Sequence, residues 1–201
     1  MASALRTISD FGDTAVLLPV AVALTAMLWR FQSWAAAACL SLAFAFCLVT
    51  MLVLKIGFLT CSPTWHVAIV SPSGHASFSA VAYGALGLIA ARHARPWQRP
   101  LIAAICLLLI AGIALSRVAL GAHSAAEMAL GLAVGLFALG IFAAPYRRLV
   151  PGRIDVALLL VVAAGIMLAF HGLRLPVEEW IRHLADAWSH FPGVCADARI
   201  E

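Results

Sequence analysis

Six stretches of apolar residues follow one another along the chain, each near the roughly 20 residues that a helix needs to cross a bilayer. They cover residues 14–29, 34–54, 73–91, 101–115, 123–143 and 154–171. Asp10 and Asp13 precede the first stretch and only Arg6 adds positive charge there, so we interpret it as a membrane helix rather than a cleaved signal peptide. The pattern predicts an all-α, integral membrane six-helix bundle that forms a single domain over residues 1–201.

The composition supports this class. Of the 201 residues, 64% are hydrophobic and 11% are charged, which is typical of membrane proteins and excludes a soluble domain. The sequence pI near 9.1 follows from the uneven distribution of arginine described next, and we expect no nucleic-acid partner.

Most arginines fall on alternate turns between the apolar stretches, and alternate turns lie on the same side of a membrane. These are Arg30, Arg92, Arg95, Arg99, Arg147, Arg148 and Arg153. Asp155 is the only carboxylate on that side, and the positive-inside rule places such turns in the cytoplasm. The opposite turns and both termini are therefore expected to face outward, which we interpret as the periplasmic side of a bacterial inner membrane.

Two compact polar clusters lie at outward ends of the apolar stretches. One covers residues 71–75 and includes Ser73, Gly74 and His75, and the other covers residues 116–123 and includes Arg117 and His123. Ionisable residues at membrane depth are costly and by default indicate a functional site. Because Lys55 ends the second stretch on the same side, we expect all three segments to converge.

The residue types suit phosphoryl transfer, in which catalysis is mostly positioning and stabilisation of charge on oxygen. Lys55 and Arg117 supply cations, and an arginine can bind two phosphate oxygens at once. Ser73 and Gly74 open a helix, where free backbone N–H groups attract anions. These four residues are the candidate phosphate-binding residues.

Two histidines and a carboxylate complete the candidate site. His123 is placed to attack phosphorus, and Glu127, four residues on, can orient its imidazole from the same helix face. His75 is placed to protonate the leaving oxygen and then to activate water. The sequence has no carboxylate cluster of the kind that divalent ions prefer, so we expect neither a metal nor another cofactor.

These motifs resemble the type 2 phosphatidic acid phosphatase (PAP2) superfamily, whose pattern is K-x6-RP, then PSGH, then SR-x5-H-x3-D. Here Lys55 is followed after six residues by Ser62 and a proline, and PSGH stands at residues 72–75. The third motif runs from Ser116 and Arg117 over five residues to His123, and Glu127 follows. The motifs cover residues 55–135, and the six-helix layout extends the resemblance over most of the chain.

The resemblance implies a phosphohistidine intermediate on His123, a general acid at His75, phosphate binding by Lys55, Ser73, Gly74 and Arg117, and no metal. Family members act on membrane lipid phosphates or pyrophosphates. We therefore expect a lipid phosphatase, with undecaprenyl pyrophosphate as the leading substrate. Phosphatidic acid, phosphatidylglycerol phosphate and a lipid A phosphate stay open. A phosphotransferase with the same intermediate and a non-catalytic lipid-phosphate binder are the alternatives, and the oligomeric state is left open.

The chain departs from the family pattern at two positions. Ser62 stands where the family has an arginine, which removes a cation worth roughly 1.5–3 kcal/mol of binding. The outward groups His66, Arg174 and Arg182 are candidates to replace it, and their spacing favours none of them. Glu127 replaces the family aspartate but keeps the carboxylate. Ser116 can either contact phosphate or satisfy a backbone carbonyl.

The tail, residues 175–201, mixes aromatic and charged residues. Its segment 177–188 is expected to form an amphipathic helix at the membrane interface, with surface anchoring favoured over a role as a lid. Cys61 and Cys195 both face outward, where a disulfide can persist, but the sequence does not decide whether they pair. For lipid access, the gap between the third and fifth helices is the expected place.

Overall fold

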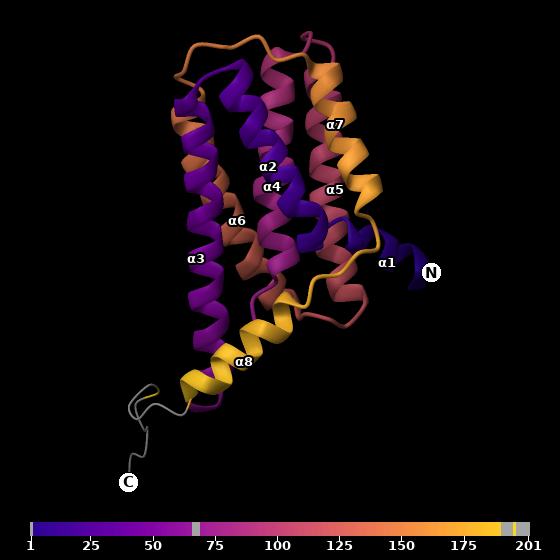
Figure 1. Cartoon of the computed structure of the whole chain (residues 1–201). Coiled ribbons are helices and arrows are strands. Elements are labelled where there is room, and N and C mark those ends of the chain that lie inside the picture. The colour runs from indigo at the N-terminus through magenta and orange to yellow at the C-terminus, as the bar shows by residue number, and fades with distance from the viewer. Residues whose placement is uncertain (1, 66–68, 190–194, 196–201) are drawn as a thin grey trace.

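The computed structural model describes residues 2–65, 69–189 and 195 of the chain. This part contains eight helices and no strand (Figure 1), so the predicted all-α fold is confirmed. The helices are α1 (Ala2–Asp10), α2 (Thr14–Phe31), α3 (Trp34–Trp65), α4 (Gly74–His93), α5 (Arg99–Ala119), α6 (Ala125–Tyr146), α7 (Val156–Ala169) and α8 (Val177–Ser189). Helices α2 to α7 correspond to the six predicted stretches, and α8 to the expected amphipathic helix. The additional helix α1 was not expected, so the predicted number of helices is too low.

Five helical stretches in the described part are long and apolar enough to cross a membrane: Ser3–Phe31, Trp34–Cys61, Gly74–His93, Arg99–Ala119 and Ala125–Tyr146. The sixth predicted crossing forms α7, which is apolar but has 14 residues. At 1.5 Å per residue, α7 is about 21 Å long. Figure 1 shows it beside the long helices, leading toward the end of the bundle where α8 lies.

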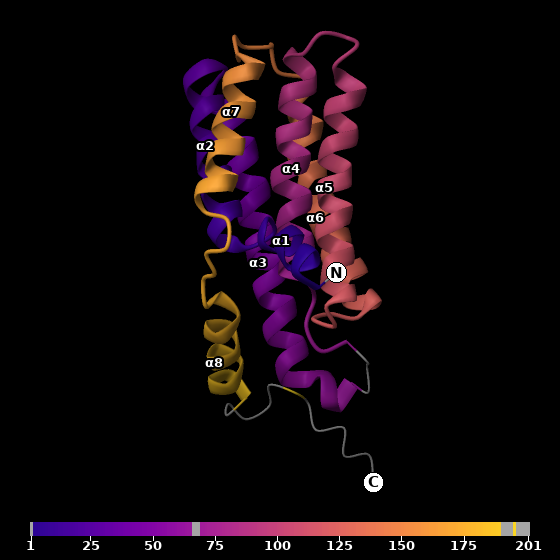
Figure 2. The ribbon, with the colours of Figure 1, turned by 90° about the vertical axis from the view of Figure 1, so that its right-hand side faces the viewer.

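Helix α3 continues well past the predicted end at residue 54 and reaches Trp65. The prediction ended the helix at Lys55 because apolar residues give way to polar ones there. A helix is held by its backbone hydrogen bonds, which also form outside the membrane, so α3 can extend beyond its apolar part. With 32 residues, α3 is about 48 Å long and exceeds a hydrocarbon core of about 30 Å. Figure 2 shows its last turns projecting beyond the other long helices.

Helix α4 occupies the centre of the bundle and is the most deeply buried of the candidate membrane helices. It packs closely against α6 through Gly131 and Gly135. A Cβ atom at Gly131 would lie 2.4 Å from the Ser73 carbonyl oxygen, and one at Gly135 would lie 2.3 Å from the Ser77 carbonyl oxygen. Small residues allow this approach of two backbones, which is a common packing mode in membranes. The expected gap between these two helices for lipid access is therefore closed.

Side chains that cap helix N-termini determine where several helices begin. Asp13 accepts a hydrogen bond from the Ala15 N–H at the start of α2, and Asp155 accepts from the Ala157 N–H at the start of α7. Ser73 caps α4, and Ser124 caps α6. Such caps satisfy N–H groups that have no acceptor within the helix. Three of these four caps, those of α2, α4 and α6, lie at the end of the bundle that carries both polar clusters.

The arginine-rich turns lie at the opposite end of the bundle (Figure 1). There the Arg92 guanidinium donates hydrogen bonds to the backbone carbonyls of Tyr146 and Leu149 and stacks 4.8 Å from the centre of the Tyr146 ring. The Arg153 N–H donates to the Phe31 carbonyl over 3.0 Å. The grouping of these turns at one end of the molecule follows the alternation predicted from the sequence.

Candidate active site

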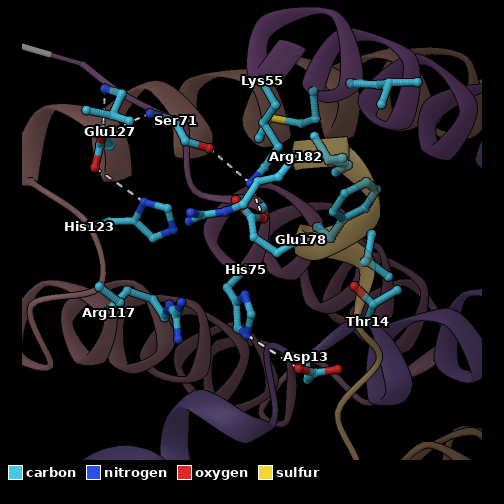
Figure 3. A pocket seen from close by; sticks show the side chains of 18 of the residues that line it. Asp13, Thr14, Lys55, Ser71, His75, Arg117, His123, Glu127, Glu178 and Arg182 are labelled. Atoms are coloured by element: carbon cyan, nitrogen blue, oxygen red, sulfur yellow. Dashed lines mark hydrogen bonds and ion pairs between the residues drawn. The ribbon is translucent and has the colours of Figure 1, made fainter. Parts of the chain in front are cut away.

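The ends of four helices surround one pocket of about 500 Å³ (Figure 3). It lies between the middle of α3, the starts of α2, α4 and α6 and the end of α5, and α8 covers one side. Six of the seven residues expected to act in catalysis or phosphate binding line it: Lys55, Gly74, His75, Arg117, His123 and Glu127. The predicted convergence of three distant motifs is therefore found in the structure.

His123 and Glu127 form a pair at the start of α6. The Glu127 Oε2 atom lies 3.3 Å from His123 Nδ1 and also accepts a hydrogen bond from the Ser124 N–H over 2.9 Å. Ser124 caps the helix by accepting from the Glu127 N–H, so the backbone and the carboxylate fix each other. A carboxylate at Nδ1 favours a proton on that nitrogen and leaves the lone pair of Nε2 for attack.

Glu127 also holds the segment that leads into α4, a role that the sequence analysis missed. Its Oε1 atom accepts hydrogen bonds from the N–H groups of Val70 and Ser71 over 2.8 and 2.9 Å. The Glu127 carbonyl accepts from the Ser73 N–H over 3.1 Å. One buried carboxylate therefore contacts both His123 and the segment that carries the PSGH motif.

The environment of His123 favours its neutral form. Burial lowers the pKa of His123 below its ordinary value of 6.5, and the nearby cations Arg117 and Lys55 lower it further, while Glu127 opposes them. Only the neutral imidazole has a lone pair with which to attack phosphorus. The cations expected to bind phosphate thus also favour the neutral form of His123, the expected nucleophile.

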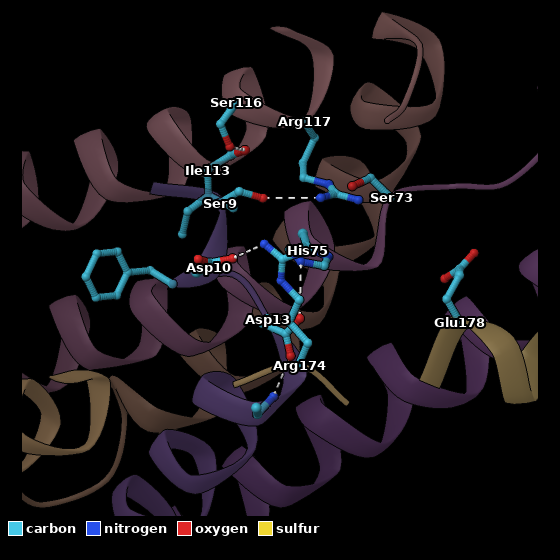
Figure 4. A network of polar contacts seen from close by, with 12 residues as sticks. Ser9, Asp10, Asp13, Ser73, His75, Ile113, Ser116, Arg117, Arg174 and Glu178 are labelled. Atoms are coloured by element: carbon cyan, nitrogen blue, oxygen red, sulfur yellow. Dashed lines mark hydrogen bonds and ion pairs between the residues drawn. The ribbon is translucent and has the colours of Figure 1, made fainter. Parts of the chain in front are cut away.

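His75, in the first turn of α4, faces a carboxylate from α2. Its Nε2 atom lies 3.8 Å from Asp13 Oδ2, which is beyond hydrogen-bond distance but within reach of an electrostatic interaction (Figure 4). At this separation the Asp13 carboxylate can influence the orientation of the His75 imidazole. Asp13 was expected only to precede the first membrane helix, although its position on the outward side was a usable signal.

Arg117 lies in the last turns of α5, and its Nη1 atom donates to the Ser9 hydroxyl of α1 over 3.2 Å (Figure 4). Its Nε atom is buried and has no hydrogen-bond partner among the described residues. Buried donors are rarely left unpaired in proteins. This donor belongs to a cation that lines the pocket, where a phosphate oxygen would satisfy it.

Lys55 is turned into the pocket rather than out toward the membrane surface. Its side chain is only 5% exposed, and its ammonium donates to the Ser71 hydroxyl over 3.2 Å and to Glu178 Oε2 over 2.5 Å. Glu178 belongs to α8 and is a pocket residue that the sequence analysis did not anticipate. It lies more than 120 residues from Lys55 in the sequence.

The two serines of the motifs have mainly structural contacts. The Ser73 hydroxyl caps α4 by accepting from the Ala76 N–H over 3.4 Å, and its phosphate-binding role stays a prediction. The Ser116 hydroxyl donates to the Ile113 carbonyl over 2.7 Å, so the backbone alternative is the one found. Ser62 lies in the last turn of α3, but its side chain, like the whole of His66, is outside the described residues.

Helix α8 packs against the projecting end of α3. The Thr60 hydroxyl donates to the Ala185 carbonyl over 3.4 Å, and Cys61 forms a disulfide with Cys195, a pairing that the sequence left open. Glu178 and Arg182 of α8 line the pocket. The favoured expectation that this helix serves only as a surface anchor is therefore wrong, because it forms part of the wall.

An apolar groove opens beside the polar pocket, between α2 and α3. It has a volume of about 520 Å³, extends along α2 to Trp29, and shares four lining residues with the pocket: Thr14, Leu48, Phe78 and Val177. Its other lining residues are almost all apolar. The structure thus joins a charged pocket to an apolar groove on one side of the bundle.

Comparison with known proteins agrees with this geometry. A family model described as the PAP2 superfamily matches residues 34–150, a range that contains Lys55, His75, Arg117, His123 and Glu127. Searches of the curated proteins and of the solved structures found no match. The matched range is more than half of the chain and includes every motif described above. The chain therefore belongs to the PAP2 superfamily.

Proposed function

We propose that this protein is a membrane lipid phosphatase that works through a phosphohistidine on His123. PAP2 proteins are generally phosphatases that act on phosphate esters, and the lipid substrate is our extension. The observation that carries the proposal is the pocket itself. His123, which Glu127 contacts at Nδ1 and whose pKa is lowered by burial and by nearby cations, faces the same space as Arg117 and Lys55.

In the first step, the Nε2 lone pair of His123 attacks phosphorus. A P–N bond forms while the bond between phosphorus and the lipid oxygen breaks, and His75 transfers its proton to that oxygen. Asp13 faces His75 across 3.8 Å. Arg117 and Lys55 stabilise the charge on the other phosphoryl oxygens.

In the second step, water attacks phosphorus on the opposite side from His123. His75 accepts a proton from this water, the P–N bond breaks, and inorganic phosphate leaves. Both histidines return to their starting states, and the proposed steps balance without a metal. With a pyrophosphate substrate, the leaving oxygen belongs to the remaining lipid monophosphate.

The apolar groove between α2 and α3 supports a lipid substrate, because it continues directly from the pocket. The segment of α2 from Thr14 to Trp29 lines the groove and rises about 22 Å, a length that suits a long hydrocarbon chain. Undecaprenyl pyrophosphate is our leading substrate, and phosphatidic acid, phosphatidylglycerol phosphate and a lipid A phosphate are the competitors.

Phosphate release by the purified protein in detergent, with EDTA present, tests this function on the four lipids. We expect release from at least one lipid, and none from His123→Ala. If the folded protein releases no phosphate from any of them, hydrolysis is excluded for these lipids. Transfer to an added acceptor alcohol would then indicate the phosphotransferase, and lipid binding without turnover would indicate the binder.

We also propose that the site faces the periplasm of a bacterial inner membrane, because the arginine-rich turns lie at the opposite end. A membrane-impermeant thiol reagent added to intact cells tests this orientation. Leu173→Cys at the site end should react and Trp97→Cys at the arginine-rich end should not, both side chains being exposed. The reverse labelling would contradict the proposal.

A further inference from the structure

The phosphate pocket lacks the cation that the family pattern places at position 62. The chain has Ser62 there, near the C-terminal end of α3. An arginine at a phosphate site can donate two parallel hydrogen bonds to phosphate oxygens, so its loss weakens binding unless another group replaces it. Among the described residues, Arg174 and Arg182 are the candidates.

Arg174 is already paired. Its Nη2 atom donates to Asp10 Oδ1 over 2.9 Å, and its side chain is 64% exposed. Figure 4 shows this pair beside Asp13 and His75. Asp10 neutralises the Arg174 charge, and Arg174 is absent from the residues lining the pocket.

Arg182 differs from Arg174 in both respects. It lines the pocket, and Figure 3 shows its side chain extending from α8 into the pocket toward His123. Within the part of the chain that the structure describes, no carboxylate forms an ion pair with it. Arg182 follows Glu178 by one helical turn, so both residues share the face of α8 that is turned toward the pocket.

The attachment of α8 explains how a residue so distant in the sequence can serve this site. Thr60 binds the Ala185 carbonyl, and Cys61 is bridged to Cys195. These anchors lie on the last turns of α3, immediately before position 62. Helix α8 is therefore held against the same turns of α3 from which the family arginine would come.

We propose that Arg182 binds phosphoryl oxygens of the substrate and replaces the arginine that the family has at position 62. The inference rests on the proposed function for the identity of the substrate, but the phosphate contact itself does not depend on turnover. It also makes α8 an integral part of the substrate site.

Two measurements on purified protein test the inference: calorimetric binding of orthovanadate, a phosphate mimic, and kcat/KM for the preferred lipid. Arg182→Gln should weaken both by about ten- to a hundredfold. The matched control is Arg95→Gln, which removes an exposed arginine at the other end of the bundle and should change neither. Thermal unfolding of each variant establishes that it is folded.

A compensating substitution sharpens the test. Ser62→Arg should restore much of the binding lost in Arg182→Gln, and it should add little to the natural chain, whose site already has its cation. Equal vanadate binding by Arg182→Gln and Arg95→Gln would overturn the inference.

The same measurements separate this inference from the proposed function. If the natural chain binds vanadate in an Arg182-dependent manner but hydrolyses no lipid, the inference stands and the phosphatase proposal fails. If the natural chain hydrolyses lipid and Arg182→Gln behaves like Arg95→Gln, the phosphatase proposal stands and the inference about Arg182 fails. A natural chain that neither binds vanadate nor hydrolyses lipid would overturn both.

Discussion

The Glu178 carboxylate lies 2.5 Å from the Lys55 ammonium, so the cation expected to bind phosphate already has an anionic partner. Glu178 reaches the pocket from α8, whereas Lys55 is buried on α3. The ammonium has three donors, so a phosphate could bind the remaining one, but it would lie beside this carboxylate and be repelled by its charge. We therefore expect Glu178 to oppose anion binding.

Removing the competing charge should strengthen anion binding. For Glu178→Gln we expect orthovanadate to bind about two- to fivefold more tightly, a modest gain because Glu178 is 44% exposed and such pairs contribute little in water. Calorimetry measures the change. Glu179→Gln, an exposed neighbour on the same helix, should have no effect. Weaker binding by Glu178→Gln would instead show that the carboxylate positions Lys55 for the substrate.

The Cys61–Cys195 disulfide should matter for activity because it secures α8. We expect the Cys61→Ser/Cys195→Ser protein to lose several-fold in kcat/KM. Adding Arg182→Gln to this disulfide-free protein should lower kcat/KM by a smaller factor than it does in the natural chain. The reason is that the disulfide is expected to act by holding Arg182 in position. Cys39→Ser, which alters a free cysteine on α3, is the control. Fully additive losses of kcat/KM would show that the disulfide does not act through Arg182.

Glu127→Gln should reduce turnover on the order of a hundredfold or more. The neutral amide no longer favours a proton on His123 Nδ1. Its NH2 group also cannot accept a hydrogen bond, so the bond from either the Ser71 N–H or the Ser124 N–H is lost. Loss of charge-assisted bonds of about 1.5–3 kcal/mol should also lower the melting temperature. Glu127→Asp should recover part of the turnover, because it restores the carboxylate. Steady-state kinetics and thermal unfolding measure the two effects, and unchanged kinetics in the amide variant would contradict the orienting role.

The pH dependence of phosphorylation should show the altered basicity of His123. Its pKa is lowered by burial and by Arg117 and Lys55, so its neutral form persists below pH 6.5 and activity should fall only at lower pH. In Lys55→Met, one of the lowering charges is removed and the acidic limb should move to higher pH. Single-turnover rates should be compared for the two proteins on one substrate, because the ionisation of the substrate then affects both pH profiles equally. A limb that stays in place, or moves to lower pH, would contradict this assignment.

Gly131→Ala should destabilise the protein and impair the site together. The new Cβ would lie 2.4 Å from the Ser73 carbonyl oxygen, so α6 must move away from the start of α4. The contact between Ser73 N–H and the Glu127 carbonyl would be disturbed as a result. Gly140→Ala on the same helix has nothing within 4 Å of its Cβ and should be neutral or slightly stabilising. Equal melting temperatures for the two variants would refute close packing at Gly131.

The helices and the motif residues were predictable because both depend on local patterns. Apolar stretches and capping residues such as Ser73 and Ser124 lie close in sequence to the structure that they determine. The expected position of Lys55, His75 and His123 on the same side of the membrane was then enough to predict that they converge, without information on helix packing. The end of α3 was misplaced, because polarity marks the limit of the membrane rather than the limit of a helix, and the short helix α1 was not predicted.

The contributions from the two ends of the chain were not predictable in the same way. Ser9 and Asp13 reach the site from before the first membrane helix, and Glu178 reaches it from after the last. The contacts of Ser9 and Glu178 depend on how the short helices α1 and α8 pack against the bundle. No spacing within the sequence encodes that packing, which is why Arg182 could not be chosen over Arg174 before the structure.

The short helix α7 has a consequence for the surrounding lipid. The first and last helices both contribute to the site, so the chain must traverse the bilayer an even number of times, and α7 must make the final traverse. It supplies about 21 Å of helix for a hydrocarbon layer of about 30 Å, and the non-helical residues after it cannot remain exposed to acyl chains. The bilayer should therefore be compressed along the flank formed by α7, at a modest cost for each ångström of mismatch. We therefore expect an asymmetric lipid annulus that is thinner beside α7 than beside the longer helices.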